Sequence, residues 1–331
     1  MAIIPVSKEA PEAATIARAA ALLGQGKLVS FPTETVYGLG GNALDPAAVA
    51  RIFEAKGRPT FNPLIVHVPD VASARRLVTA WPDQAEKLAA RWWPGPLTLV
   101  LPKSRDVPSE VTAGLGTVAL RVPAHPVALA LLKAAGVPIA APSANRSGEL
   151  SPTTAEHVAG GLGDRVAMIL DAGPTTVGIE STVLDLSGRE PLLLRPGMIT
   201  REELEAVVGP VAVAEPAASR EAPRPAPGML DQHYAPRARA RLFANVAETG
   251  PLMAVVRAKG GRVHALVRSV RVPGVNHEER LPADPAGYAR ELYAALHRVD
   301  TPECSLILIE SPPAGEAWRG IRDRLERACG K

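Results

Sequence analysis

The sequence predicts an α/β protein of α+β character, with a twisted mixed sheet covered by helices and a smaller α/β domain after it. Short apolar runs and amphipathic segments are mixed without strict alternation over residues 1–209, which favours a partly antiparallel sheet. A proline-rich stretch then separates two regions that each show strand and helix patterns. The chain has 331 residues, enough for two domains that each bury a core.

Helices in the first region are marked by amphipathic periodicity and by capping residues. Asp45 is a good N-cap, Pro46 takes the first helical position, and Gly57 follows the last turn. Helices are predicted over residues 11–23, 46–56, 71–79, 83–93, 125–135, 154–159 and 200–208. Short apolar runs bounded by glycine, proline or polar residues predict strands over residues 27–31, 64–68, 97–101, 117–122, 139–141, 167–170, 182–186 and 191–194.

The second region follows a linker that is predicted over residues 210–237. Five prolines between positions 210 and 227 keep such a segment extended and semi-rigid. Beyond it the pattern predicts strands over residues 240–244, 252–256, 263–267 and 306–309, and helices over residues 284–297 and 316–329. We therefore expect a large domain over residues 1–209 and a small C-terminal α/β domain over residues 238–331.

The composition is that of an ordinary globular protein, with 47% hydrophobic and 21% charged residues. No apolar run reaches about 18 residues, and the N-terminus lacks a basic segment followed by an apolar one, so neither a membrane span nor a signal peptide is expected. Only Cys304 and Cys329 are present, which argues against a disulfide framework and a zinc site. These features predict a cytoplasmic protein without membrane contact.

The net charge is +3, and the charged residues are spread evenly along the chain. No block of basic residues resembles a nucleic-acid-binding arm, although weak or transient RNA contact is left open. The sequence also lacks the GxxxxGK[ST], HExxH, CxxC and GxSxG motifs. Gly38-Leu39-Gly40-Gly41 resembles a dinucleotide fingerprint only superficially, because no acidic residue follows a second strand at the right distance. Any nucleotide site is therefore of another kind.

Cationic side chains recur where predicted strands and one helix end. Lys56 and Arg58 flank Gly57, Arg121 closes one apolar strand, and Arg195 closes another. Lys56 and Arg58 alone would suit a solvated helix C-terminus, and Arg121 alone would equally suit a salt-bridge anchor or an anion clamp. Taken together, four cations at such positions indicate an anion site, since a guanidinium matches a carboxylate or phosphate in two parallel hydrogen bonds.

Small polar side chains accompany these cations in turns that contain glycine or proline. They are Thr35, Ser143, Asn145 and Ser181. Each could simply cap its turn, and His67 could be a core histidine that bonds to a backbone carbonyl. As a set, however, hydroxyls and cations at strand ends suit a polyanion together with a small zwitterion, because loops on a rigid sheet are where binding groups collect.

A series of motifs resembles the YrdC-like domain of L-threonylcarbamoyladenylate synthases. In order they read FPTETVYGLGGNA, KGRP..NPL..H, WPGPLT, TVALRVP, APSAN.SG, GIESTV..L and LLRPG, between residue 12 and about residue 200. The proline-rich linker, its Gly228-Met229 and His233-Tyr234-Ala235-Pro236 segments, and the trailing region resemble the two-domain form of that family. The resemblance implies a YrdC-like catalytic domain followed by a smaller Rossmann-like α/β domain.

The family resemblance implies an adenylyltransferase that joins L-threonine, bicarbonate or CO2, and ATP into threonylcarbamoyl-AMP and releases pyrophosphate. A separate threonylcarbamoyl transferase complex would then transiently take the product and modify the adenosine beside the anticodon of tRNA. Weak direct tRNA contact is left open. Mg²⁺ is the implied cofactor, and ATP rather than protein side chains would hold it.

The resemblance also assigns site residues by their position in the motifs. Catalytic roles fall on Lys56, Arg58, Ser143 and Asn145. Contacts to L-threonine fall on Thr35, His67, Arg121, the Ala141 backbone and Ser181. Contacts to ATP fall on Arg58, Asn62, Thr117, Ser143, Ser151, Arg195 and, from the linker, Tyr234.

Two alternatives are kept beside this interpretation. One is a double-stranded RNA- or tRNA-binding, ribosome-associated module without catalysis, which the even charge distribution disfavours. The other is a carbamoyl-adenylate step in hydrogenase maturation, which the absence of acylphosphatase and zinc-finger segments disfavours. Pyrophosphate release that requires both threonine and bicarbonate distinguishes all three.

Overall fold

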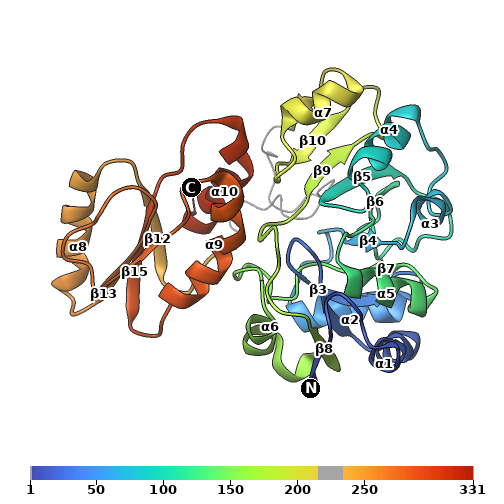
Figure 1. Cartoon of the computed structure of the whole chain (residues 1–331), viewed down its shortest axis with the longest axis horizontal. Helices are drawn as coiled ribbons and strands as arrows, with labels where there is room; N and C mark the ends of the chain where they lie inside the picture. The colour runs from blue at the N-terminus through green and yellow to red at the C-terminus, as the bar shows by residue number, and fades with distance from the viewer. Residues whose placement is uncertain (1, 215–233, 331) are drawn as a thin grey trace.

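The computed structural model describes residues 2–214 and 234–330, which form a large and a small α/β unit around separate sheets (Figure 1). Most of the predicted linker, residues 215–233, lies outside the described residues. At its start the chain forms a short edge strand, β11 (Ala212–Val213), which pairs in parallel with β10 (Leu192–Arg195). This strand was not predicted from the sequence.

The large unit holds, within the described residues, an 11-stranded mixed sheet with the strand order β1-β8-β2-β3-β7-β4-β6-β5-β9-β10-β11. Its remaining strands are β1 (Ala2–Pro5), β2 (Val29–Pro32), β3 (Tyr37–Asn42), β4 (Ile65–His67), β5 (Leu97–Pro102), β6 (Thr117–Arg121), β7 (Ile139–Ala140), β8 (Met168–Asp171) and β9 (Thr182–Asp185). Its helices are α1 (Ala13–Gly24), α2 (Pro46–Lys56), α3 (Val71–Arg75), α4 (Asp83–Trp92), α5 (Pro126–Ala135), α6 (Ala155–Leu162) and α7 (Arg201–Val208). The predicted fold class is confirmed.

Helices cover both faces of the large sheet, as the alternation of side chains shows. Val29 and Phe31 of β2 pack with α1 and α5, whereas Leu28 just before them packs in the cluster on the opposite face. In β7, Ile139 packs on the face covered by α1 and α5, and Ala140 packs on the opposite face. A sheet buried on both sides provides the rigid support from which the loops at the strand ends project.

Glycines in β3 let neighbouring side chains approach the strand closely. A Cβ at Gly40 would lie 2.8 Å from Phe31 Cε1, and one at Gly41 would lie 3.0 Å from Ile52 Cδ1. The sequence predicted no strand here, because three glycines between positions 38 and 41 and nearby hydroxyls are typical of loops. In the fold the missing side chains make room for Phe31 and for helix α2.

The small unit is built on a four-stranded parallel sheet with the order β12-β15-β13-β14. Its strands are β12 (Arg239–Phe243), β13 (Arg262–Val267), β14 (His277–Arg280) and β15 (Cys304–Glu310), and its α-helices are α8 (Thr249–Arg257), α9 (Pro285–Val299) and α10 (Arg319–Cys329). The parallel order confirms a second, smaller α/β unit. Figure 1 shows α9 and α10 on the side of this sheet that faces the large unit, and α8 on the far side.

Several local predictions were wrong. Residues 252–256 were expected to form a strand but belong to helix α8, which follows a capping box between Asn245 and Glu248. Only Met253 of that apolar run is buried, and Val255 is 61% exposed, so the run does not indicate a buried strand. Helix α3 ends at Arg75 instead of continuing to residue 79, and the edge strands β1 and β14 were not expected.

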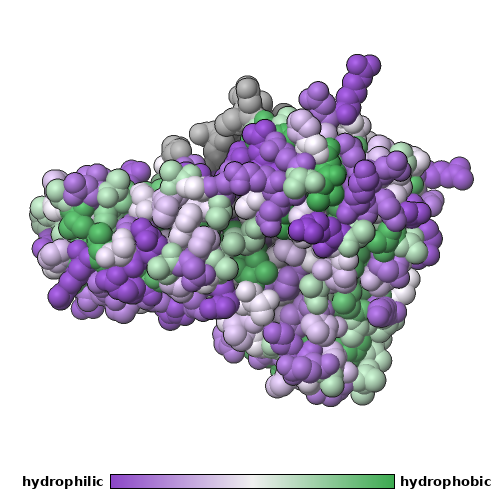
Figure 2. Space-filling view, turned by 45° about the horizontal axis from the view of Figure 1, so that its top comes forward, coloured by the Kyte–Doolittle hydropathy of each residue, from purple (hydrophilic) through white to green (hydrophobic). Residues whose placement is uncertain are grey.

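No helix among the described residues has the length and apolar character needed to span a bilayer. On the face shown in Figure 2, hydrophobic residues lie in small groups between hydrophilic ones, over both units. Scattered apolar groups of this kind are normal for a protein surface and do not mark a docking site.

Candidate active site

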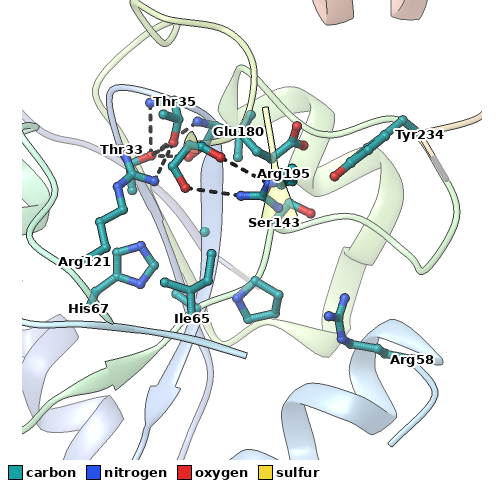
Figure 3. Close-up of a pocket in the computed structure, with 15 residues that line it drawn as sticks. Thr33, Thr35, Arg58, Ile65, His67, Arg121, Ser143, Glu180, Arg195 and Tyr234 are labelled. Atoms are coloured by element: carbon teal, nitrogen blue, oxygen red, sulfur yellow. Dashed lines mark hydrogen bonds between the residues drawn. The ribbon is translucent and has the colours of Figure 1, made fainter. Parts of the chain in front are cut away.

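One pocket collects most of the site residues that the sequence predicted. Its lining consists of Thr33, Thr35, Val36, Gly38, Arg58, Ile65, His67, Arg121, Ala141, Pro142, Ser143, Glu180, Ser181, Arg195 and Tyr234 (Figure 3). These residues come from strands β3, β4, β6 and β10, from the loops after β2, α2 and β7, from the loop before β9, and from the segment at Tyr234. The sheet therefore brings together segments that are far apart in the sequence.

Arg121 is held rigidly at the end of β6. Its Nη1 donates to Thr35 Oγ1 at 2.9 Å, its Nε donates to the Gly95 carbonyl at 3.1 Å, and its Nη2 pairs with Glu34 Oε1 at 2.6 Å. Both members of the ion pair are buried. Because the guanidinium is fixed on three sides, it presents a pre-oriented fork to the pocket.

His67 lies beside Arg121 on the neighbouring parallel strand, in register with it. Burial, and then the nearby Arg121 charge, lower the pKa of His67 to about 3, so the imidazole is neutral at physiological pH. Its Nδ1 is buried and has no hydrogen-bond partner among the described residues. A neutral ring with an unused nitrogen in a pocket suits a small polar ligand.

Ser181 and Arg195 form a second polar group in the pocket. Arg195 Nε donates to the Ser181 carbonyl at 3.1 Å, and its Nη2 donates to Ser181 Oγ at 3.2 Å. The Ser181 hydroxyl also lies 2.7 Å from Thr98 Oγ1. Burial lowers the pKa of Arg195 from its ordinary value, but a guanidinium remains cationic at neutral pH.

Arg58 enters the pocket from the loop after helix α2. Gly57 caps that helix in the left-handed conformation, with φ of 59°, and so turns the chain toward the sheet. Arg58 Nε and Nη2 donate to the carbonyls of Asn62 and Pro63 at 3.1 and 3.0 Å. Burial lowers the pKa of Arg58 to about 10, so the side chain remains charged near neutral pH.

Lys56 does not line the pocket but supports one of its walls. Its Nζ donates to the Ser143 carbonyl at 2.6 Å and to the Asn145 carbonyl, and it is 3% exposed. Burial, with a smaller contribution from the Arg58 charge, lowers its pKa. Lys56 therefore holds the turn that carries Ser143 into the pocket.

Three further predicted residues are buried without lining the pocket. Asn62 is fully buried, and neither side-chain polar atom has a partner among the described residues. Asn145 donates through Nδ2 to the carbonyls of Arg146 and Glu149, both at 2.8 Å, while its buried Oδ1 lacks a described partner. Ser151 donates to Glu180 Oε1 at 2.5 Å. Unpartnered buried amides are costly in a folded protein, which suggests that a ligand completes them.

The fold places Thr117 well away from Arg121. It begins β6, whereas Arg121 ends it, so the two lie about 13 Å apart at the usual rise of a strand. A second hollow shares Arg58 with the pocket, and Thr117 does not line it. Its lining is Ala50, Phe53, Glu54, Arg58, Thr60, Phe61, Ser109, Glu110, Ala113 and Gly114.

Sequence reasoning missed two acidic residues: Glu180, which lines the pocket, and Glu34, which pairs with the lining residue Arg121. Both lie inside quoted motifs, next to the predicted Thr35 and Ser181. A carboxylate beside an anion site would repel the ligand unless a cationic side chain neutralises it. Here Glu34 pairs with Arg121, and Glu180 pairs with Arg324 at 2.6 Å. The adjacency to Thr35 and Ser181 was the available signal.

Two family models together match almost the whole chain. The model described as "Telomere recombination" matches residues 21–197, and the model described as "Threonylcarbamoyl-AMP synthase, C-terminal domain" matches residues 199–330. The resemblance to L-threonylcarbamoyladenylate synthases is thereby confirmed.

Relatives and solved structures agree with these models. A threonylcarbamoyl-AMP synthase of Bacillus subtilis is 45% identical over 95% of this chain and 93% of the relative. One of Chromobacterium violaceum is 37% identical, over 52% of this chain but 89% of the relative. The crystal structure of Pyrococcus abyssi Sua5 complexed with L-threonine superposes with a TM-score of 0.94, at 43% identity, over 100% of this chain and 98% of that one. The chain therefore belongs to the threonylcarbamoyl-AMP synthase family, in the form that carries both domains.

Proposed function

We propose that this protein joins L-threonine, bicarbonate or CO2, and ATP into threonylcarbamoyl-AMP and pyrophosphate. The observation that carries the proposal is a single pocket in which three buried arginines, Arg58, Arg121 and Arg195, lie among small polar groups. Such a pocket suits a substrate carboxylate at one end and a polyphosphate at the other. The full-length similarity to named synthases supports the same reaction.

L-Threonine is proposed to bind at the Arg121 end of the pocket. The Arg121 fork would bind its carboxylate, in the orientation that Glu34 and Thr35 set. The neutral His67 and the hydroxyl of Ser181 would meet its amine and side-chain hydroxyl, and the carbonyl of Ala141 would accept from the amine. The Pyrococcus abyssi protein was solved in complex with L-threonine, which supports L-threonine as the ligand.

ATP is proposed to lie between Arg195 and the second hollow. Arg58 and Arg195 would bind phosphate oxygens, and Ser143, Ser151, Asn62 and Tyr234 would supply further polar contacts. The base would enter the hollow lined by Phe53, Phe61 and Ala113. ATP bound in this way would extend well beyond the threonine end of the pocket. Its length would account for a predicted ATP contact, Thr117, at the opposite end of β6 from Arg121.

The proposed chemistry needs orientation more than a strong base. The threonine nitrogen forms a bond to carbon dioxide and loses a proton, which gives an anionic carbamate. A carbamate oxygen then attacks the α-phosphorus in line, and the bond to pyrophosphate breaks. Arg58 would stabilise the charge that develops on the phosphate, while Lys56 fixes the turn of Ser143 and Asn145.

Mg²⁺ would enter with ATP. Among the residues that the structure describes, no three His, Cys, Asp or Glu side chains are grouped so as to hold a metal ion. Arg58 and Arg195 would repel a bare divalent cation but suit one already bound to a triphosphate. Bound to ATP, Mg²⁺ neutralises charge on the phosphate oxygens.

We also propose the wider context of the reaction. Residues 1–209 would form the catalytic domain, residues 210–237 the linker, and residues 238–331 the C-terminal domain. The labile product would pass to a separate threonylcarbamoyl transferase complex that modifies tRNA, with at most weak tRNA contact by this chain. Since ATP, threonine and tRNA meet in the cytoplasm, we place the protein there.

Pyrophosphate release tests the reaction against its alternatives. The wild-type protein should release pyrophosphate only when threonine, bicarbonate and ATP are all present. Release without threonine would instead favour a carbamoyl-adenylate reaction, and no release under any condition would favour a binding module.

A further inference from the structure

A buried arginine of the C-terminal unit reaches the edge of the active site. Arg324 of helix α10 is 1% exposed and carries the largest fully buried side chain of the described chain. Its Nε donates to Glu180 Oε2 at 2.6 Å, its Nη2 to the Glu180 carbonyl at 3.3 Å, and its Nη1 to the Pro196 carbonyl at 3.0 Å. One guanidinium therefore ties together two loops of the large unit.

Those two loops carry substrate-site residues at the adjacent positions. Ser181 follows Glu180 and Arg195 precedes Pro196, and Arg195 bonds directly to Ser181. Arg324 itself is absent from the pocket lining. It lies behind the contact between Ser181 and Arg195 and fixes the backbone on both sides of it.

We propose that Arg324 is a positioning residue of this reaction, through which the C-terminal domain fixes Ser181 and Arg195 in the geometry that substrates require. The inference rests on the proposed function, because it assigns those two residues to the substrates. It gives the C-terminal domain a role in catalysis without giving it a ligand site.

The carboxylate of Glu180 is the centre of this connection. It accepts from Ser151 Oγ at 2.5 Å and from the Tyr293 hydroxyl of helix α9 at 3.1 Å, in addition to Arg324. Burial alone would raise the pKa of Glu180, but the charges of Arg324 and Arg195 keep it below its ordinary value. Without Arg324, the buried Glu180 carboxylate would have Arg195 as its nearest counter-charge. Arg195 would then pair with Glu180 instead of the substrate.

Backbone contacts fix the helix that carries Arg324. A Cβ at Gly320, one turn earlier on α10, would lie 2.6 Å from the Gly197 carbonyl oxygen. A Cβ at Gly178 would lie 2.3 Å from the carbonyl oxygen of Ala289 on α9. Glycine at these points lets α10 contact the loop after β10 directly and lets α9 contact the loop before β9 directly, so the position of the Arg324 guanidinium is fixed.

Arg324 also contacts a third segment of the site. Its Cζ lies 5.3 Å from the ring centroid of Tyr234, a pocket residue that the sequence analysis assigned to ATP. The Tyr234 ring lies 5.9 Å from that of Tyr293. Arg324 thus contacts three segments of the site: the loop before β9, the loop after β10 and the segment at Tyr234.

The shorter Chromobacterium violaceum relative bears the same name although it aligns with only 52% of this chain. The chemical step itself therefore need not involve Arg324. This is what we expect of a residue that acts only by positioning other residues.

The test compares full-length variants for kinetics of pyrophosphate release. Arg324→Gln removes both the positive charge and the planar guanidinium. Arg324→Lys keeps the positive charge but loses the guanidinium geometry. Arg298→Gln is the control, since Arg298 lies on helix α9 with a half-exposed side chain and pairs with Glu279, which does not bond to Arg324. We expect Arg324→Gln to lower kcat/KM about 100-fold and to raise the KM for ATP. Arg324→Lys should recover part of the loss, and the control should stay within about twofold.

A second variant separates positioning from folding. Glu180→Gln combined with Arg324→Gln removes both buried charges, so its melting temperature should return toward that of the wild type. Positioning predicts that its kcat/KM stays low; a merely structural role predicts that activity returns with stability. Wild-type kinetics in Arg324→Gln would overturn the proposal.

Threonine affinity by calorimetry, measured below each melting temperature, provides a readout besides turnover. It should weaken about tenfold in Arg324→Gln, because Ser181 is displaced. Unchanged affinity together with unchanged kinetics would exclude the role of Arg324. A wild-type protein that neither binds threonine nor releases pyrophosphate would contradict the proposed function instead.

Discussion

Glu34 and Arg121 form an ion pair, 2.6 Å between Oε1 and Nη2, that is buried on both sides. The second carboxylate oxygen of Glu34 accepts from the Ala124 amide at 3.0 Å, so the loops after β2 and β6 are joined at the base of the pocket. A buried pair of this kind is costly to break, because each removed partner leaves the other charge unpaired. The substrate carboxylate would thus meet a guanidinium whose orientation is already set.

Replacing Arg121 by lysine should weaken threonine binding while leaving ATP binding nearly unchanged. An ammonium is a point charge and cannot make the parallel hydrogen bonds of the guanidinium. We expect the dissociation constant for threonine to rise about 10- to 100-fold, measured by calorimetry. Arg76→Lys, on the exposed end of α3, is the control. Unchanged threonine affinity would remove Arg121 from the amino-acid site.

Replacing Lys56 by alanine should lower turnover although Lys56 does not line the pocket. Its ammonium holds the carbonyls of Ser143 and Asn145, and a small displacement of that turn would misplace the nucleotide. We expect kcat to fall about 100-fold in steady-state kinetics. Lys133→Ala, on the exposed end of α5, should leave kcat unchanged. Full turnover of Lys56→Ala would show that the turn needs no such support.

Replacing Gly40 by alanine should destabilise the large unit. The added Cβ would lie 2.8 Å from Phe31 Cε1 and 3.1 Å from the Val29 carbonyl oxygen, and the backbone cannot yield cheaply. We expect a loss of about 1–3 kcal/mol in the free energy of unfolding, measured by urea denaturation. Gly116→Ala, with no atom within 4 Å of the new Cβ, should change it by less than about 0.5 kcal/mol. Equal stability of both variants would mean that β3 does not need its glycines.

His125 should make the protein less stable as the pH falls below about 6.5. It is 3% exposed and accepts from the Val127 amide at 3.2 Å, as the N-cap of α5, which requires a neutral ring. Burial lowers its pKa to about 4 in the folded state. Between that pH and the ordinary value of about 6.5 only the unfolded chain binds the proton, so folding loses up to about 1.4 kcal/mol per pH unit.

His125→Asn isolates this contribution, because asparagine keeps a capping acceptor but does not titrate. The free energy of unfolding of this variant should fall less steeply than that of the wild type between pH 6.5 and 4.5, although the buried His67 still contributes to both. Parallel curves for the two proteins would show that His125 is not buried in its neutral form.

Local signals predicted local structure well. Asp45, Pro46 and Gly57 defined α2 correctly, since capping depends on neighbouring residues alone. The apolar residues 252–256 could not be assigned in the same way, because only the tertiary fold decides that Val255 is exposed. The glycines of β3 were likewise ambiguous until the position of Phe31 was known.

The site was predictable as a set of residue types but not as a set of contacts. Motif order placed Thr35, Arg121 and Ser181 in one pocket, as the structure has them. The pairing of Glu180 with Arg324 joins residues 144 positions apart, and no local pattern indicates such a pair. For this reason the role that we propose for the C-terminal unit could be inferred only from the structure.

The most direct test of the proposed reaction is mass spectrometry of the adenylate formed from threonine, ATP and ¹³C-bicarbonate. We predict a threonylcarbamoyl-AMP species that carries the ¹³C label, appears together with pyrophosphate, and is lost when threonine is omitted. Its absence, or an adenylate without the bicarbonate carbon, would contradict the function proposed for this protein.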